Sequence, residues 1–307
     1  MLFMSLPCRK NTEQETPITG IAKRDFLAAG LGLGAGLAFA EGALAQNCQP
    51  KELPRRTART VNLFKSPDMY PNALAVMTDG PGGLWVAQQK VKGIQAERSH
   101  APEQPGLEEV WLLDWNGKLQ KTLTGGSQVT SGLAYGNGCV WVVANNEADF
   151  PPPVTGVWQV DMNNRTRSVH QIPLGGGGSH GAQWHDGKLW IIASRLPAML
   201  RIDPKTFVPD LAIPIVRDDQ DMSNSHDMTF DDDGFIWLVT GNRGRGRHFL
   251  IKYDPRTGKP VEMIALTEDS AEPHGLVWYK GAFYGCDAGH PNHQSPTGGW
   301  IFRIDLV

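Results

Sequence analysis

The sequence predicts an all-β protein, a β-propeller, because one repeat recurs five times along the chain. Each copy carries a polar residue at the same place, which we call the register position: Asn72, Ser131, His180, His226 and His274. An aromatic residue follows each of them, at Trp85, Trp141, Trp190, Trp237 and Tyr284, with spacings of 56, 49, 47 and 47 residues. Short apolar runs at this period, separated by turn residues, are typical of propeller blades.

Each copy is expected to form four strands. In the third copy these are residues 180–184, 188–194, 199–204 and 207–215, where apolar and polar residues alternate between Gly or Asp turns. Aspartates mark the third-to-fourth turns, at Asp114, Asp161, Asp203, Asp254 and Asp305. Asp bonds its own backbone in such turns, so these aspartates are expected to be structural.

The last copy ends after three strands, within residues 299–307. Residues 59–66 resemble the fourth strands of the other copies and are expected to complete that blade. Closing the ring in this way removes an exposed sheet edge. The sequence therefore predicts five blades, or six if residues 87–109 form an irregular one.

Residues 1–45 are expected to be an export signal. Lys23-Arg24 precedes a short apolar, Gly-rich stretch, and Ala43-Leu44-Ala45 offers small residues for cleavage before Gln46. The segment resembles a twin-arginine signal with lysine in place of the first arginine. We expect one propeller domain at 46–307, periplasmic or secreted, with no stable membrane insertion after processing.

Composition fits an ordinary soluble globule, and we expect a monomer that acts on a small molecule. There are 29 basic and 32 acidic residues, without a basic stripe interleaved with aromatics, so a nucleic-acid partner is not expected. The mature chain keeps Cys48, Cys139 and Cys286, of which the last two are expected to be buried small hydrophobes.

The long second-to-third connections predict which end of the propeller carries function. These are residues 88–106, 145–156, 242–248 and 287–299, whereas the other turns are short. First strands begin at this same end and converge on the axis. His180, His226 and His274 should therefore meet, and three imidazoles suit one divalent metal ion with open positions for water and substrate.

Nearby polar residues extend the expected site. Glu272, two residues before His274, could ligate the metal or act as a general base, and Asp287 could reach the same place or simply cap a loop. Of the acidic residues in the preceding crossover, Asp221 is the candidate ligand. Candidate substrate-binding and acid–base residues lie in the long loops: Asn145, Arg243, Arg245, Arg247, His290 and His293.

Repeats such as NALAV…GGLWVA and HGLVWYKGAFYGC resemble the propeller group that holds the streptogramin lyases, of the virginiamycin B lyase type, and the gluconolactonase-like proteins. Glu272-Pro273-His274, with His226 one blade earlier and Asp287 after it, is similar to the Glu-x-His, preceding His and following Glu of streptogramin lyases. Those lyases have shorter repeats, seven blades and Glu at the place of Asp287, and His180 has no counterpart there.

The resemblance implies catalytic roles for His274, Glu272, His226 and Asp287. It implies metal-dependent cleavage of a C–O bond by eliminative opening of an ester or related linkage, with His274 as the base and a metal held in part by the carboxylates. One alternative is a lactone or ester hydrolase, in which metal-activated water attacks. The other is a non-catalytic propeller that binds a ligand or protein.

Overall fold

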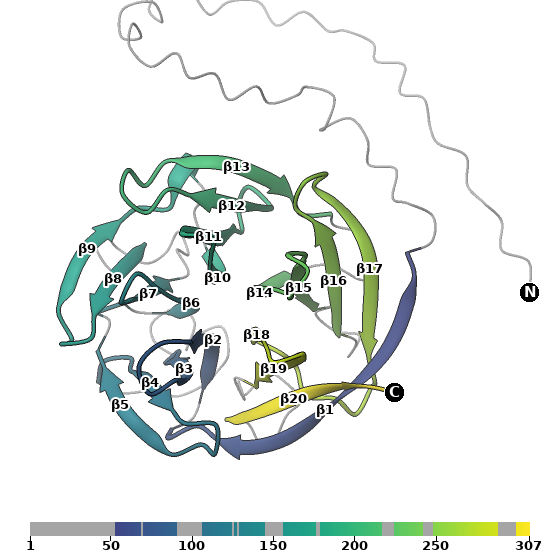
Figure 1. Cartoon of the computed structure of the whole chain (residues 1–307), viewed down its shortest axis with the longest axis horizontal. Coiled ribbons are helices and arrows are strands. Elements are labelled where there is room, and N and C mark those ends of the chain that lie inside the picture. The colour runs from purple at the N-terminus through teal and green to yellow at the C-terminus, as the bar shows by residue number, and fades with distance from the viewer. Residues whose placement is uncertain are drawn as a thin grey trace, which may run out of the picture. The chain divides into compact units, whose positions relative to one another are not determined.

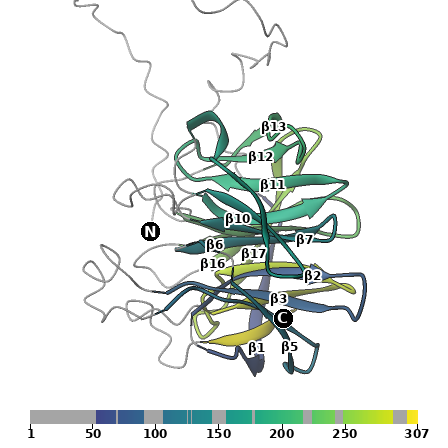
Figure 2. The ribbon, with the colours of Figure 1, turned by 90° about the vertical axis from the view of Figure 1, so that its left-hand side faces the viewer.

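The computed structural model describes residues 53–68, 70–90, 106–124, 126–127, 129–144, 156–175, 179–216, 224–241, 248–287 and 299–307, and every structural statement here refers to these ranges. They form an all-β propeller of five blades around a central axis, shown along the axis in Figure 1 and from the side in Figure 2. The five-blade prediction is confirmed. Apart from strands, one 3₁₀ turn occurs among these residues, at Pro173–Gly175.

Each of the first three blades is a separate four-stranded antiparallel sheet whose strands follow one another outward from the axis. Blade 1 holds β2 (Pro71–Met77), β3 (Gly83–Gln88), β4 (Val110–Leu113) and β5 (Leu119–Leu123). Blade 2 holds β6 (Thr130–Gly136), β7 (Cys139–Ala144), β8 (Val157–Asp161) and β9 (Thr166–His170). Blade 3 holds β10 (Ser179–His185), β11 (Lys188–Ala193), β12 (Ala198–Ile202) and β13 (Pro209–Pro214).

Blades 4 and 5 share one eight-stranded sheet because β1 (Arg55–Lys65) joins them. Blade 4 holds β14 (Asn224–Phe230), β15 (Ile236–Gly241), β16 (His248–Asp254) and β17 (Lys259–Leu266). Blade 5 holds β18 (Gly275–Tyr279), β19 (Ala282–Cys286) and β20 (Trp300–Leu306), with β1 outermost. Antiparallel pairing of β1 with β20 runs from Ala58 opposite Leu306 to Lys65 opposite Trp300, which confirms the predicted ring closure.

The first residues of β1 add a contact that the repeat pattern did not predict. Arg55 to Ala58 pair in parallel with Met263 to Leu266 of β17, the outer strand of blade 4. One strand therefore closes blade 5 and also ties it to its neighbour.

The hydrophobic core is divided into five clusters, and each lies between two adjacent blades. The repeated aromatic of the second strand contributes at each interface. Trp85 stacks on Tyr135 of the next blade at 6.4 Å and Trp141 stacks on Trp184 at 5.8 Å, measured between ring centroids. Trp190 meets Phe230 and Trp237 meets Phe283 edge-on, and Tyr284 is tilted against Trp115. The aromatic repeat is thus a packing device between blades.

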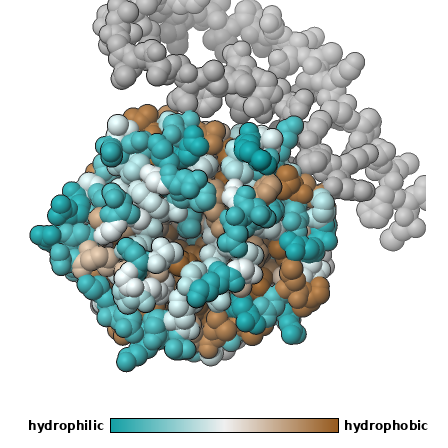
Figure 3. Space-filling view, in the orientation of Figure 1, coloured by the Kyte–Doolittle hydropathy of each residue, from teal (hydrophilic) through white to brown (hydrophobic). Residues whose placement is uncertain are grey.

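Four of the five predicted turn aspartates have the structural role that the sequence predicts, whereas the fifth, Asp305, lies within β20 and accepts hydrogen bonds from the Arg303 side chain. Asp114, Asp161, Asp203 and Asp254 each accept a hydrogen bond from the backbone N–H two residues later. Cys139 and Cys286 are buried and not disulfide-bonded, as expected for small core hydrophobes. No helix among the described residues is long and apolar enough to cross a membrane. Hydrophilic residues cover much of the surface in the view of Figure 3.

First strands β2, β6, β10, β14 and β18 lie next to one another in a closed circle around the axis (Figure 1). Four of them carry a register shift near their start, at Pro71/Ala73, Thr130/Gly132, His180/Ala182 and Ser225/Met228. A bulge leaves backbone groups outside the strand pairing and re-aims the local side chains. In each of these four strands the bulge coincides with the register position.

Candidate functional site

Buried polar side chains gather at the end of the propeller that carries the long second-to-third loops, which we call the loop face. Asn72, Gln88, Gln89, Glu108, Ser127, Thr130, Ser131, Ser179, Asp227, Thr240, His274 and Asp287 are all buried there, whereas Thr229 and Asp254 are the buried polar residues nearer the opposite end. Burying polar groups is costly unless they are hydrogen-bonded, so such a concentration favours a functional role for this face.

The three register histidines stand side by side on this face. His180 lies in β10, His226 in β14 and His274 immediately before β18. The rings of His180 and His226 are 5.7 Å apart between centroids and perpendicular, and those of His226 and His274 are 4.4 Å apart. The repeat register therefore brings together residues that are 46 and 48 positions apart in sequence.

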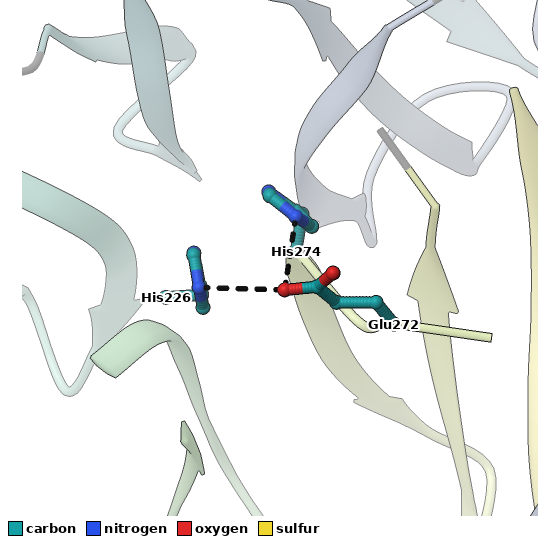
Figure 4. A group of neighbouring side chains, drawn as sticks. All are labelled: His226, Glu272 and His274. Atoms are coloured by element: carbon teal, nitrogen blue, oxygen red, sulfur yellow. Dashed lines mark ion pairs between the residues drawn. The ribbon is translucent and has the colours of Figure 1, made fainter. Parts of the chain in front are cut away.

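Glu272 lies between two of these imidazoles (Figure 4). Its Oε1 is 3.6 Å from His274 Nε2 and 3.9 Å from His226 Nε2. One ligand atom from each of His226, Glu272 and His274 lies within 4.8 Å of the other two, so these side chains could hold one metal ion. His180 is not part of this group among the described residues.

Asn72 fixes the tautomer of His274. The Asn72 amide donates from Nδ2 to the carbonyl oxygen of Thr130 over 3.0 Å, so its Oδ1 is the atom that faces His274. His274 donates from Nδ1 to that oxygen over 2.6 Å. A neutral imidazole with its proton on Nδ1 has its lone pair on Nε2, the nitrogen that faces Glu272.

Glu108 supports this arrangement from the third-strand side of blade 1. Its carboxylate accepts backbone N–H groups of Val129 and Thr130, each over 2.8 Å, and that of Lys90 over 2.9 Å. Burial raises the pKa of Glu108, while these hydrogen bonds act in the opposite direction. Val129 has φ of 59°, a strained value for a β-branched residue, and Glu108 holds it in place.

His180 makes a different contact, with Ser194 at the end of β11. His180 Nδ1 and Ser194 Oγ are 2.8 Å apart. This bond turns the His180 ring edge-on to His226. The ligand role predicted for His180 therefore stays a prediction, with Ser194 as its observed partner.

Asp287 is buried directly after β19 and takes part in main-chain pairing. Its N–H donates to the carbonyl oxygen of Trp300, and its own carbonyl accepts from Gly299. Its catalytic role stays a prediction. Seven further candidates lie outside the described residues: Asn145, Asp221, Arg243, Arg245, Arg247, His290 and His293.

Sequence reasoning missed Asp227, which follows His226 and is fully buried. Burial raises the pKa of its carboxyl well above the ordinary value, while backbone N–H donors oppose that shift. A signal for it exists in the repeat itself. The residue after the register position is Ala73, Gly132, Gly181 and Gly275 in the other four blades, so a charged residue at 227 breaks a small-residue rule.

Comparison with known proteins supports the fold. No family model and no curated protein sequence matches the chain. The solved glutaminyl cyclase of Myxococcus xanthus is 14% identical over 83% of this chain and 100% of its own, with a TM-score of 0.56. The virginiamycin B lyase of Staphylococcus aureus is 15% identical over 80% of this chain and 69% of its own, with a TM-score of 0.42.

A streptogramin B lyase structure is 13% identical over 81% of this chain and 97% of its own, with a TM-score of 0.43. These structural neighbours are β-propellers, as this chain is. At such identities the likeness concerns the fold, and function has to be argued from the side chains of the loop face.

Proposed function

We propose that this protein is an exported, metal-dependent propeller enzyme that cleaves a C–O bond in a small molecule by elimination, opening an ester or related linkage. The observation that carries the proposal is the group formed by His226, Glu272 and His274, in which Asn72 leaves the Nε2 lone pair of His274 facing Glu272. A base and a candidate metal ligand lie within 4 Å of each other in this group.

The donor set fits a divalent cation. Imidazole nitrogen and carboxylate oxygen are ordinary ligands of such ions, and two histidines with one glutamate form a known catalytic set that leaves positions open. When bound, the ion would polarise a substrate carbonyl and make the adjacent C–H more acidic. His226 and Glu272 are the residues that we expect to hold it in the elimination reaction.

His274 would act as the base in this mechanism. Its Nε2 takes the proton from carbon, the C–H electron pair forms a double bond, and the C–O bond breaks with its electrons leaving on oxygen. The resulting imidazolium has an acceptor near each N–H, because Asn72 Oδ1 is 2.6 Å from Nδ1 and Glu272 Oε1 is 3.6 Å from Nε2. Stabilising the charged form of the base in this way favours proton abstraction.

The same three residues favour a second candidate, a lactone or ester hydrolase. If His274 ligates the ion together with His226 and Glu272, the set is that of a metallohydrolase that activates water. Product analysis in water enriched in heavy oxygen separates the two reactions. Elimination leaves the products unlabelled, whereas hydrolysis places solvent oxygen in one of them.

A panel of esters and lactones, with and without an acidic proton next to the carbonyl, is the substrate set for that experiment. His170→Gln is a matched control, since His170 lies in the outer strand β9 and bonds Ser168. Turnover that depends on His274 and not on His170 supports the assignment. Turnover that survives His274→Ala contradicts the role of His274 in either reaction.

Substrate binding would involve the long loops of the same face, with Asn145, Arg243, Arg245 and His290 as the proposed contacts and Asp287 as a further catalytic carboxylate. The export part of the proposal rests on the segment before Gln46. N-terminal sequencing of protein recovered from the periplasm or medium tests it. Material that begins near Gln46 supports export, and an intact Met1 terminus contradicts it.

A further inference from the structure

The position after the register residue has a steric requirement. The first strands pack so closely around the axis that a Cβ on Gly132 would lie 2.7 Å from the carbonyl carbon of Gly181. A Cβ on Gly181 would lie 2.7 Å from Asp227 Cα and Oδ1, and one on Gly275 would lie 2.9 Å from the backbone nitrogen of Leu74. Small residues are therefore needed in most blades, and the space they leave is occupied by the side chain of Asp227.

The carboxyl of Asp227 faces backbone N–H groups of four blades and accepts hydrogen bonds from two of them. Oδ1 accepts the N–H of Met228 over 2.9 Å, and Oδ2 accepts that of Leu276 over 2.8 Å. The N–H groups of Ala182 and Leu74 also lie near this carboxyl and lower its pKa. Met228, Leu276, Ala182 and Leu74 belong to β14, β18, β10 and β2 respectively.

The four N–H groups come from equivalent positions of the repeat. Leu74, Ala182, Met228 and Leu276 each lie two residues after a register residue, namely Asn72, His180, His226 and His274. In β2, β10 and β14 the register shift at this place takes the backbone out of regular pairing. Converging backbone N–H groups form an anion-binding ring, and here an internal carboxyl fills it.

We propose that Asp227 is the positioning residue of the site: its carboxyl occupies a ring of backbone N–H donors on the axis and thereby sets the spacing of the register side chains. Among the described residues, blade 2 contributes no N–H group to this ring. Its register residue is Ser131, which is neither a histidine nor the hydrogen-bond partner of one of the register histidines. The four blades that it joins carry the three register histidines and Asn72, which fixes the His274 tautomer.

The expected effect on metal affinity rests on the function proposed above. The expected effects on stability and on the orientation of the histidine rings do not depend on that function. Replacing Asp227 by glycine gives position 227 the residue found in three other blades and leaves the N–H ring open. Acetate has the size and the carboxyl group of the missing side chain. It should therefore bind to the Asp227→Gly protein and not to the wild type, in which the ring is filled.

The first measurement is thermal unfolding at neutral pH in sodium acetate and in sodium chloride of the same concentration. We expect Asp227→Gly to unfold at lower temperature than the wild type, and about 0.1 M acetate to raise its Tm by a few degrees beyond the effect of chloride. Acetamide, which is neutral and of similar size, should rescue less. Asp254→Gly is the matched control, because Asp254 caps a turn near the opposite end and leaves no such ring.

The second measurement reports position rather than stability. The ¹⁵N chemical shifts of the histidine rings at fixed pH show the tautomers, and that of His274 should change in Asp227→Gly and return in acetate. Metal affinity, measured with zinc or manganese alone, should fall by about 10- to 100-fold in the variant and recover with acetate. Asp254→Gly should leave both unchanged.

Equal responses of Asp227→Gly to acetate and chloride overturn the proposal, as does a variant that stays unfolded in acetate. The proposal is also overturned if a folded Asp227→Gly protein shows the histidine ¹⁵N chemical shifts and the metal affinity of the wild type. A wild type that binds no metal defeats the proposed function instead. In that case the thermal unfolding and the histidine ¹⁵N chemical shifts still decide the role of Asp227.

Discussion

His274 donates its Nδ1 proton to Asn72 over 2.6 Å, and the two residues hold the same register position in the last and first blades of the ring. The bond therefore crosses the blade interface that β1 closes. Asn72 is itself held by Thr130, whose N–H is bonded to Glu108. This chain of contacts links the closure of the fold to the availability of His274 Nε2.

Replacing Asn72 by leucine should reduce turnover by about 10- to 100-fold with the fold retained, since such supporting partners typically contribute that much. Leucine fills a similar volume but accepts no hydrogen bond, so the His274 tautomer is no longer fixed. Steady-state kinetics, with circular dichroism to check folding, measures the effect. Ser131→Ala is the control at the register position of blade 2. Equal losses in both variants would show that Asn72 has no special link to His274.

Glu272→Gln should keep part of the metal affinity while lowering turnover more strongly. The amide oxygen can still approach an ion, but it no longer offers a negative charge to a protonated His274, 3.6 Å away. Metal titration beside kcat on the same preparations tests this split. A variant that loses metal and turnover in proportion would assign Glu272 to metal binding alone.

Removing residues 46–66 from the mature chain should destabilise the whole propeller. The deletion exposes the edges of β20 and β17, to which β1 is paired. We expect a fall in Tm on the order of 10 °C, given that about 2–4 °C is lost per kcal/mol in a domain of this size class. A chain that starts at residue 53 is the control. Unchanged unfolding of the longer deletion would refute ring closure by β1.

The aromatic contacts between blades predict that two substitutions lower the unfolding free energy by different amounts. Trp141 is 1% exposed and stacks on Trp184, so Trp141→Ala should cost about 3–5 kcal/mol of unfolding free energy. Trp115→Ala removes contacts with Tyr279 and Tyr284, and all three rings are only partly buried, so it should cost less. Denaturant unfolding measures both. A larger loss at Trp115 would contradict the assigned role of the second-strand aromatics.

The contacts of Asp203 predict how the unfolding free energy decreases at acid pH. The hydrogen bond from Lys188 is the main cause that lowers the pKa of Asp203 to about 2, with the N–H groups of Lys205 and Thr206 adding to it. A pKa lower in the folded than in the unfolded chain contributes stability at pH above the unfolded value of about 4, which is lost as the pH falls towards 2.

Asp203→Asn should therefore be less stable than the wild type near neutral pH and should converge with it at low pH. Urea midpoints measured between about pH 2 and pH 6 cover the window in which this carboxyl titrates. Lys188→Met should make the urea midpoint depend less on pH in this range, because it removes the main hydrogen-bond donor to Asp203. Parallel pH profiles for wild type and Asp203→Asn would rule out this contribution.

The sequence could predict the propeller because each blade repeats the same signals: the register residue, the second-strand aromatic and the turn aspartate. It could also predict that β1 completes the last blade, since only three strands follow His274. The same register predicted which histidines meet. These features depend on alternation and period, which a single sequence displays directly.

Other parts of the site depend on backbone geometry that the period does not encode. The surroundings of the Asp227 carboxyl depend on the bulges near Leu74 and Ala182, whose N–H groups lie near it. The orientation of His180 follows from its bond to Ser194, which directly follows a different strand, β11. Parallel pairing of Arg55 to Ala58 with β17 has no counterpart in the repeat.

The central claim is that the group of His226, Glu272 and His274 forms a site for one divalent ion on which activity depends, and metal content per chain is its most direct measure. The account predicts about one ion in the purified wild type, as in sites of this donor type, loss of metal and activity in His226→Ala, and loss of activity in His274→Ala. Loss of metal as well in His274→Ala would favour the hydrolase, in which His274 is a ligand. His180→Ala tests whether His180 supplies a further ligand. A wild type that is active without metal, or one whose metal content is unaffected by the His226 change, would contradict the claim.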